Sequence, residues 1–287
     1  MSVFSALIIG HDSLALNCAR MLREAGHQIR AIVTRHAEFQ AWAEAEGIAR
    51  IAPGAGLADR VQGLDIDWLL SIANLEIIPD AVLARAGKGA VNFHDGPLPR
   101  YAGLNAPVWA ILNDEPSHGV TWHRIAGGID EGNILAQRMF DVVPEETALS
   151  LNTKCFAAAL ESFPQVIEAL AGDDAGGVPQ DLGSRSYFAR DQRPEHFGVL
   201  DLSQNTNSIL RIVRALDHGD YWNPMMRAKC GTGRGPVLVG TAQAADGQAA
   251  AGTILEVSGQ GIVVATGDGA VRMSDLSAAD GSAIEPA

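Results

Sequence analysis

The fold is decided by residues 5–34, SALIIGHDSLALNCARMLREAGHQIRAIVT. A short apolar run comes first, followed by a segment whose apolar residues recur every three or four positions, and then by a second apolar run. The outer segments have the length and composition of buried strands, whereas the middle one has the period of an amphipathic helix. The stretch therefore predicts a strand, a helix and a strand, the unit from which parallel sheets are built.

The same alternation continues along the first half of the chain. We expect a helix at 37–47, a strand at 67–73, a short helix after Pro79 and a strand at 89–94. A helix at 105–112, β-rich segments at 119–125 and 133–142, and a long helix at 147–170 complete this part. The pattern predicts an α/β domain at 1–171, with a Rossmann-like open and mainly parallel sheet covered on both faces.

The composition changes after this domain. Residues 172–204 are rich in Gly, Pro and Asp without any period, which indicates a linker. A helix with a good N-cap follows from Asn205, and then come four short apolar segments separated by Gly-containing turns. Residues 205–287 therefore predict a helix and a small antiparallel β-barrel, OB-like, or a sandwich.

Charge and cysteine usage exclude several classes of function. The net charge is −13, and residues 200–287 carry nine acidic against six basic side chains, which disfavours a nucleic acid partner. The three cysteines are scattered, so neither a disulfide framework nor a metal site is expected. The N-terminus has no signal peptide and the chain no membrane-spanning run, which predicts a cytoplasmic location. Gly10 stands alone where a dinucleotide-binding turn needs three glycines, so we interpret it as a turn residue.

The most chemically capable residues follow the strand at 89–94, in the stretch 91–103, VNFHDGPLPRYAG. Ligands of parallel sheets bind beyond the carboxyl ends of the strands, where this strand ends. Asn92 and His94 are two positions apart, so both side chains project from one face of the strand. An amide donor beside an imidazole suits acyl transfer, and Asp130, in the Gly-rich loop of WHRIAGGIDEGNIL, can supply a carboxylate. Each of these residues is also a common turn former.

The chain resembles the folate-dependent formyltransferases, which use 10-formyltetrahydrofolate. The resemblance lies in a set of three motifs: N-x-H, then L-P-R-Y-x-G, then a G-V-T segment that ends in G-I-D-E-G. The resemblance covers most of residues 1–170, and the later segments resemble the second domain of the methionyl-tRNA formyltransferase branch. It implies that Asn92, His94 and Asp130 are catalytic. Asn92 and protonated His94 would stabilise an oxyanion, while Asp130 would tune His94, and no metal is needed.

The resemblance also implies where the two substrates bind. The loop after the strand at 67–73 and the loop before Asp130 should hold the folate, through Ser71, Ala73, Leu75, Ile77, Ile78, Ile125, Gly128 and Ile129. Leu75, Ile77 and Ile78 could equally be ordinary core. Acceptor contacts are expected from Arg100, Tyr101 and His123. Asp95 follows His94 where many members of the family have Pro or Ser, so Asp95 could be a second residue that orients His94.

Three readings of the acceptor remain open. The form NFHDGPLPRYAGLNAPVWAI resembles the formylation domains of non-ribosomal peptide synthetases, which act on an aminoacyl group held by a carrier protein, with an adenylation domain as a possible covalent neighbour. A second reading within the family is an amino-sugar nucleotide, methionyl-tRNA, or water, which would make the chain a formyltetrahydrofolate hydrolase. The third is a folate-binding scaffold without turnover, against which the intact Asn, His and Asp argue.

Overall fold

The structure is a computed structural model that describes residues 2–172, 175–233 and 235–285. The chain divides into two compact units. The first comprises Met1–Gly103, His118–Phe140 and Lys154–Tyr187, and the second Leu104–Ser117, Asp141–Thr153 and Phe188–Ala287. The second unit therefore takes in two short segments that precede the expected linker, and the domain limits 171 and 204 stay predictions.

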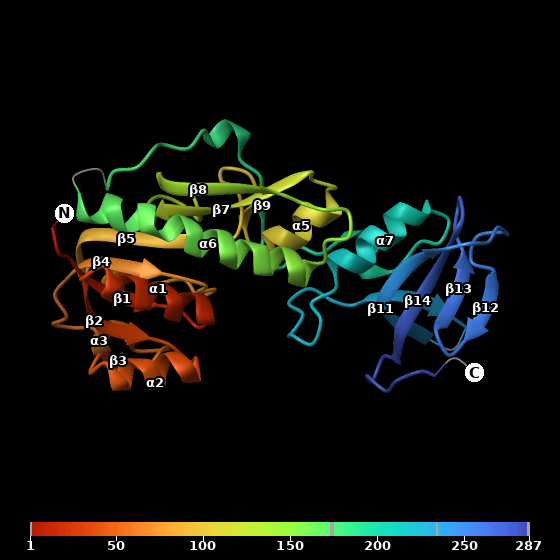
Figure 1. The fold of residues 1–287 in the computed structure, drawn as a ribbon, viewed down its shortest axis with the longest axis horizontal. Coiled ribbons are helices and arrows are strands. Elements are labelled where there is room, and N and C mark those ends of the chain that lie inside the picture. Colours follow the sequence, from red (N-terminus) through yellow and green to blue (C-terminus); the bar gives the residue numbers. More distant parts are fainter. Residues whose placement is uncertain (1, 173–174, 234, 286–287) are drawn as a thin grey trace. The chain divides into compact units, whose positions relative to one another are not determined.

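A seven-stranded sheet forms the first unit, with the strand order β3-β2-β1-β4-β5-β7-β8 (Figure 1). Neighbouring pairs from β3 to β5 are parallel, and β7 runs antiparallel to β5. The bounds are β1 Ser5–Ile9, β2 Gln28–Val33, β3 Ala49–Ile51, β4 Ile66–Ser71, β5 Ala86–His94, β7 Ser117–Arg124 and β8 Ile134–Asp141. Strands β1 to β5 thus end at the same edge of the sheet.

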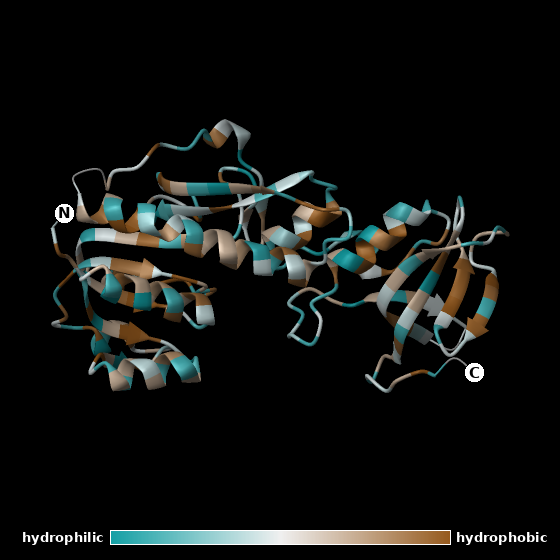
Figure 2. Ribbon diagram, viewed as in Figure 1, coloured by the Kyte–Doolittle hydropathy of each residue, from teal (hydrophilic) through white to brown (hydrophobic). Residues whose placement is uncertain are grey.

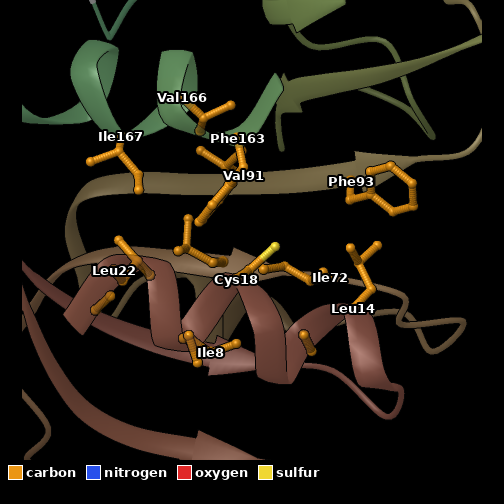
Figure 3. Close-up of a cluster of buried hydrophobic side chains, with 14 of the residues drawn as sticks. Ile8, Leu14, Cys18, Leu22, Ile72, Val91, Phe93, Phe163, Val166 and Ile167 are labelled. Carbon is orange, nitrogen blue, oxygen red and sulfur yellow. The ribbon is translucent and has the colours of Figure 1, made fainter. Parts of the chain in front are cut away.

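Helices cover both faces of this sheet because the central strands are apolar on both sides. On one face, α1 (Ser13–Glu24), α2 (Ala37–Ala45) and α6 (Ala148–Ala171) enclose a core that includes Ile8, Val91 and Phe163 (Figure 3). On the other face, α3 (Leu57–Arg60) and α4 (Asp80–Leu83) pack on a smaller cluster around Leu69. Hydropathy follows this arrangement, with largely hydrophobic central strands and helices of mixed colour (Figure 2).

Gly10 lies where β1 turns into α1, and its small size is required there. A Cβ atom at this position would lie 2.3 Å from the carbonyl oxygen of Ile72 and 2.5 Å from the Cβ of Ala15. Both distances are shorter than any van der Waals contact, so the turn, the first helix and the end of β4 approach one another only because residue 10 is Gly. Gly10 is therefore a turn residue, as interpreted from the sequence, and close packing is the reason why a glycine is needed there.

The second unit contains α5 (Ala106–Leu112), α7 (Thr206–Ala215) and a five-stranded antiparallel sheet. Its strand order is β10-β11-β14-β13-β12, with β10 Ala228–Thr232, β11 Gly235–Ala245, β12 Ile254–Ser258, β13 Gly261–Ala265 and β14 Ala270–Ala278. Asn205 caps α7 through its side-chain oxygen, which accepts a hydrogen bond from the Ser208 backbone N–H at 2.8 Å. The expected α/β sheet followed by a small β domain is confirmed.

Some short elements escaped the sequence patterns. These are β3, α3, β10, the strands β6 (Ala102–Gly103) and β9 (Tyr187–Phe188), and two 3-10 turns, η1 (Leu182–Ser184) and η2 (Glu195–Gly198). Among the described helices, none combines the length and the apolar composition that a bilayer crossing needs. No cluster of three or more His, Cys, Asp or Glu residues in the described parts of the chain is arranged to hold a metal ion.

Candidate active site

The candidate site lies at the edge where the parallel strands end. Strand register places Ile9, Ser71, Asn92 and His123 on successive neighbouring strands. Asn92 and His94 alternate with Phe93, whose ring packs against Trp122 in the core. The core contact of Phe93 fixes which face of β5 carries Asn92 and His94, as the period of a strand requires.

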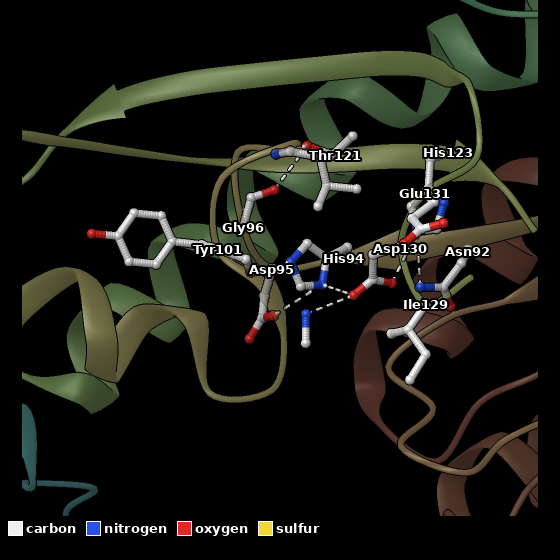
Figure 4. A network of polar contacts seen from close by, with 12 residues as sticks. Asn92, His94, Asp95, Gly96, Tyr101, Thr121, His123, Ile129, Asp130 and Glu131 are labelled. Carbon is white, nitrogen blue, oxygen red and sulfur yellow. Dashed lines mark hydrogen bonds and ion pairs between the residues drawn. The ribbon is translucent and has the colours of Figure 1, made fainter. Parts of the chain in front are cut away.

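His94 is buried, and both of its ring nitrogens face oxygen atoms (Figure 4). Its Nε2 lies 2.7 Å from the backbone oxygen of Tyr101, and because a carbonyl only accepts, Nε2 is the donor. Its Nδ1 faces Oδ2 of Asp130 at 3.6 Å and Oδ1 of Asp95 at 3.7 Å. The bond to Tyr101 therefore fixes the ring, and Nδ1 is left as the nitrogen that can serve a substrate.

Asp130 is held in place from several sides. Its Oδ2 accepts a hydrogen bond from the Gly103 backbone N–H at 2.8 Å, and its Oδ1 lies 3.3 Å from Nε2 of His123. Burial would raise the pKa of this carboxyl, but the hydrogen bonds to His123 and Gly103 and the nearby charge of His94 lower the pKa to about 2. Asp130 is therefore a permanent anion at neutral pH. Its backbone φ is +56°, in the left-handed region that Asp tolerates.

His123 connects Asn92 to Asp130. Its Nδ1 donates to the backbone oxygen of Arg124 at 2.9 Å, which directs Nε2 into the site. There Nε2 lies 3.3 Å from Nδ2 of Asn92 and 3.3 Å from Oδ1 of Asp130. A neutral His123 accepts from the Asn92 amide, whereas a protonated His123 donates to Asp130. In the neutral case one hydrogen of the Asn92 amide remains for a substrate oxygen.

Asp95 flanks His94 on the side opposite to Asp130 (Figure 4). Its side chain keeps 29% of its surface exposed, against 9% for Asp130. Desolvation raises the pKa of Asp95, and the neighbouring charge of Asp130 adds to this effect, although the charge of His94 opposes it. The two carboxylates beside one imidazole thus have pKa values shifted in opposite directions, a feature typical of catalytic sites.

Polar side chains of β7 and β8 hold the backbone that follows His94. Thr121 Oγ1 donates to the backbone oxygen of Gly96 at 2.8 Å and accepts from the Leu98 N–H at 3.1 Å. Gln137 donates to the backbone oxygen of Leu98 at 2.8 Å, and His118 Nε2 lies 2.9 Å from the backbone oxygen of Asp95. The irregular loop is therefore rigid because neighbouring strands satisfy its backbone groups.

Two features hold the loop that carries Asp130: the close packing of Gly132 against the backbone of Arg124, and hydrogen bonds from Gln180, which is distant in sequence. A Cβ atom on Gly132 would lie 1.8 Å from the Arg124 backbone oxygen, so only Gly fits. Gln180 Nε2 donates to the backbone oxygens of Asp130 and Gly132 at 2.8 and 2.7 Å. Gln180 lies in the segment that the sequence predicts to be a linker, and no local pattern marks it as part of the site.

The residues expected to bind folate lie at the end of β4 and on the two loops beside Asn92, and their folate contacts stay predictions. Ser71 pairs with Asn92 in the β4–β5 ladder, and Ala73 begins the following loop with a φ of +48°. Ile78 and Ile125 both pack against the smaller core cluster, which brings the two loops to one side of the sheet. Gly128 donates its backbone N–H to Glu131.

Three of the expected folate contacts are apolar side chains that the protein leaves exposed. Ile77 is 85% exposed, Leu75 62% and Ile129 50%. The alternative that Leu75 and Ile77 are ordinary core is therefore wrong, whereas Ile78 is half-buried core. These side chains are accessible to a ligand, and their contact with folate stays a prediction.

The residues expected to contact the acceptor occupy different environments. Arg100 is exposed, with its guanidinium carbon 5.3 Å from the centre of the Tyr101 ring. The Tyr101 ring is buried and meets His118 edge-on, so the clear contribution of Tyr101 is its backbone oxygen, which holds His94. His123 lies between Asn92 and Asp130, as described above. Their contacts with an acceptor stay predictions.

The arrangement has the parts of an acyl-transfer site. A fixed amide and an imidazole can donate hydrogen bonds to a developing oxyanion, and an anionic Asp130 can balance a protonated His94. The class that the fold and the site fit is therefore an α/β enzyme of acyl transfer.

Comparison with known sequences identifies the class more closely. The family described as formyl transferase matches residues 10–167, and the formyl transferase C-terminal domain matches residues 194–287. The first match alone spans more than half of the chain. The protein belongs to the formyl transferase family, which confirms the resemblance to that family seen in the sequence.

Solved structures with the same fold include HypX and two proteins described as formyltransferases. HypX from Aquifex aeolicus, in complex with tetrahydrofolic acid, has a TM-score of 0.71 and 20% identity over 96% of this chain and 44% of its own. The sugar 3N-formyl transferase WlaRD, with dTDP and 5-N-formyl-THF, has a TM-score of 0.74 and 19% identity, covering 96% and 98%. The N-formyltransferase from Helicobacter canadensis, in complex with folinic acid and dTDP-3-aminofucose, has a TM-score of 0.74 and 20% identity. The match covers 95% of this chain and 99% of that enzyme. This chain thus spans less than half of HypX.

Proposed function

We propose that this enzyme transfers the formyl group of 10-formyltetrahydrofolate to a primary amine, and that the amine is an aminoacyl group held by a carrier protein. The observation that carries formyl transfer is the placement of the Asn92 amide and the His94 imidazole beside the anionic Asp130. The exposed side chains of Leu75, Ile77 and Ile129 fit the pterin of the donor.

The residues have separate roles in this reaction. The acceptor nitrogen attacks the formyl carbon, and the carbonyl oxygen gains negative charge as the carbon becomes tetrahedral. Asn92 Nδ2 and a proton on His94 Nδ1 donate to that oxygen, because the other His94 nitrogen is occupied by Tyr101. Asp130 balances the charge of His94, and His123 Nε2 lies beside both the Asn92 amide and Asp130. Collapse of the adduct breaks the bond to N10 of the folate, which receives a proton.

Two features of the sequence support a carrier-bound aminoacyl acceptor. The stretch NFHDGPLPRYAGLNAPVWAI resembles the formylation domains of non-ribosomal peptide synthetases, and the net charge of −13 disfavours tRNA as an acceptor. An amino-sugar nucleotide is the second candidate, because WlaRD and the Helicobacter canadensis enzyme match this chain over nearly their full lengths. The two acceptors differ in charge as well as in size, so they can be compared directly.

The test is a product assay with matched acceptors. The full chain is incubated with 10-formyltetrahydrofolate and either an aminoacyl-loaded carrier protein, the same carrier without its aminoacyl group, or a dTDP-amino sugar. Release of tetrahydrofolate and a formyl mass gain on the loaded carrier alone support the proposal. A formyl group found on the sugar alone would show that the acceptor is an amino-sugar nucleotide and not a carrier-bound aminoacyl group. Release without any acceptor would indicate hydrolysis, and binding without release a scaffold.

A further inference from the structure

We infer that Asp95 is the base of this reaction, the group that takes the proton which an ammonium acceptor must lose before its nitrogen can attack. The inference rests on the proposed transfer to a primary amine, and it assigns a role to a carboxylate that the mechanism above does not use. Asp95 lies at the reacting end of β5 with Oδ1 3.7 Å from His94 Nδ1. It is therefore beside the group that would hold the formyl oxygen.

The need for a base follows from the chemistry of the acceptor. An α-amino group has a pKa near 8, so it reaches the site largely as an ammonium ion, which has no lone pair. Transfer forms a bond between the acceptor nitrogen and the formyl carbon and breaks the bond between that carbon and N10. The ammonium loses two protons over the whole reaction. One proton ends on N10, and the other must leave through a base to water.

Asp130 is unsuited to this task although it is closer to the centre of the site. Its Oδ2 accepts from the Gly103 N–H and its Oδ1 faces His123, so both oxygens are engaged. These contacts lower its pKa to about 2, and so weak a base gains little by taking a proton at neutral pH. Only 9% of its side-chain surface is exposed, which leaves little access for the water that must remove the proton.

Asp95 has the opposite properties. Among the described residues, no other residue donates a hydrogen bond to its carboxylate, whose one ion-pair contact is His94. The side chain is 29% exposed, so a proton accepted there can pass to water. Desolvation raises the pKa of this carboxyl, which makes it a better base than Asp130. The geometry and the direction of this shift point to the same group.

The backbone of Asp95 is fixed while its carboxylate remains available. His118 Nε2, from β7, lies 2.9 Å from its backbone oxygen, and Cys155 Sγ, from α6, lies 3.9 Å from the same atom. The charged groups facing the carboxylate are His94, the last residue of β5, and Asp130, on the loop before β8. A fixed backbone with a partly exposed side chain suits a residue that must accept and release a proton in each cycle.

The test uses the full chain with Asp95→Asn, which keeps the shape and removes the base, and with Asp95→Glu, which keeps a carboxylate. Glu161→Gln is the matched control, because Glu161 is an exposed carboxylate on α6 that pairs with Arg138. Glycinamide serves as a small α-amino acceptor beside the loaded carrier, and kcat/KM is measured from pH 6.5 to pH 9.5. Binding of 5-formyltetrahydrofolate is measured in parallel.

We expect Asp95→Asn to lower kcat/KM about 100-fold at pH 6.5 but less than about 5-fold at pH 9.5, where the acceptor is already neutral. Asp95→Glu should regain at least about tenfold at pH 6.5, and Glu161→Gln should match the wild type. An equal loss at both pH values, or no loss, would overturn the role of Asp95 while leaving formyl transfer intact. A wild-type chain that binds the folate but formylates no amine would overturn both proposals.

Discussion

Charged side chains are buried at the carboxyl edge of the seven-stranded sheet. In the five-stranded sheet of the second unit they lie on the surface. At the edge, His94, His123 and Asp130 are withdrawn from water, and Asp130 lies 3.6 Å from His94 and 3.3 Å from His123. In the five-stranded sheet, Arg272 pairs with Glu256 on the surface at 3.0 Å. A buried group of charges is costly, whereas a surface pair costs and contributes little.

The difference indicates where function lies. The surface pair and the cap of α7 each have a local structural purpose, since the pair joins β12 to β14 across the intervening β13 and the cap completes a helix end. The buried group carries a desolvation cost that apolar side chains of the same volume would avoid, so its presence indicates a role beyond packing. Variants in the two regions should therefore separate activity from stability, and the following tests are ordered by the size of the expected effect.

The largest effect is expected on catalysis at the edge. The double variant Asn92→Ala with His94→Ala removes both donors to the oxyanion, and we expect kcat to fall by at least about 10⁴-fold, equivalent to about 5.5 kcal/mol. Steady-state assays with the acceptor found above measure this loss. The circular dichroism spectrum and the thermal unfolding midpoint should remain close to those of the wild type. If the variant fails to fold, the two side chains are needed for stability and the proposed separation of activity from stability is wrong.

The next effect concerns the core beneath the edge. Phe163 on α6 is fully buried, with its ring 4.9 Å from that of Trp122 on β7. Phe163→Ala should lower the free energy of unfolding by about 3–5 kcal/mol through lost packing and a cavity. Urea unfolding measures the loss, and Phe163→Leu, which refills part of the space, should recover part of it. A loss below about 1 kcal/mol would contradict the core as described.

The loss of stability at acid pH should depend on the ionisation of Asp130. Its pKa falls from 3.8 to about 2 on folding, so its contribution is fully present above pH 3.8 and is lost as the pH falls through 2. The shift corresponds to about 2 kcal/mol. Unfolding free energies measured between pH 5 and pH 2 should therefore decline less steeply in Asp130→Asn than in the wild type. Parallel curves for the two proteins would show that Asp130 is not held as an anion.

The smallest effect is expected at the cap of α7. Asn205→Ala removes the side-chain oxygen that accepts from the Ser208 N–H, and it should destabilise the chain by about 1 kcal/mol. Asn205→Asp keeps an acceptor and serves as the control. Formyl transfer by both variants should equal that of the wild type at temperatures below unfolding, and a specific loss of activity would give the second unit a catalytic role.

Much of this molecule could be predicted from local patterns. The strand, helix and strand at residues 5–34 predict the parallel sheet because period and length depend only on nearby residues. Asn92 and His94 stand out because they end a strand and Asp130 because it lies in a Gly-rich loop, and the family resemblance joins the three as a predicted catalytic set. The short strands β3 and β10 were missed, since three to five residues carry too little periodicity to be recognised.

The rest of the site depends on contacts between residues far apart in sequence. Gln180 holds the Asp130 loop across about fifty positions, and Thr121 and Gln137 hold the loop after His94 from neighbouring strands. No single-sequence pattern encodes such pairs, because only folding brings them together. The position of His123 between Asn92 and Asp130 follows from register in the same way.

The most direct test of the account follows the formyl group itself. The wild-type chain and the Asn92→Ala with His94→Ala variant are each incubated with 10-formyltetrahydrofolate and an aminoacyl-loaded carrier protein, and the intact carrier is weighed by mass spectrometry. We predict the mass gain of one formyl group on the amine with the wild type and none above background with the variant. Equal formylation by both proteins would contradict the assignment of catalysis to this edge of the sheet.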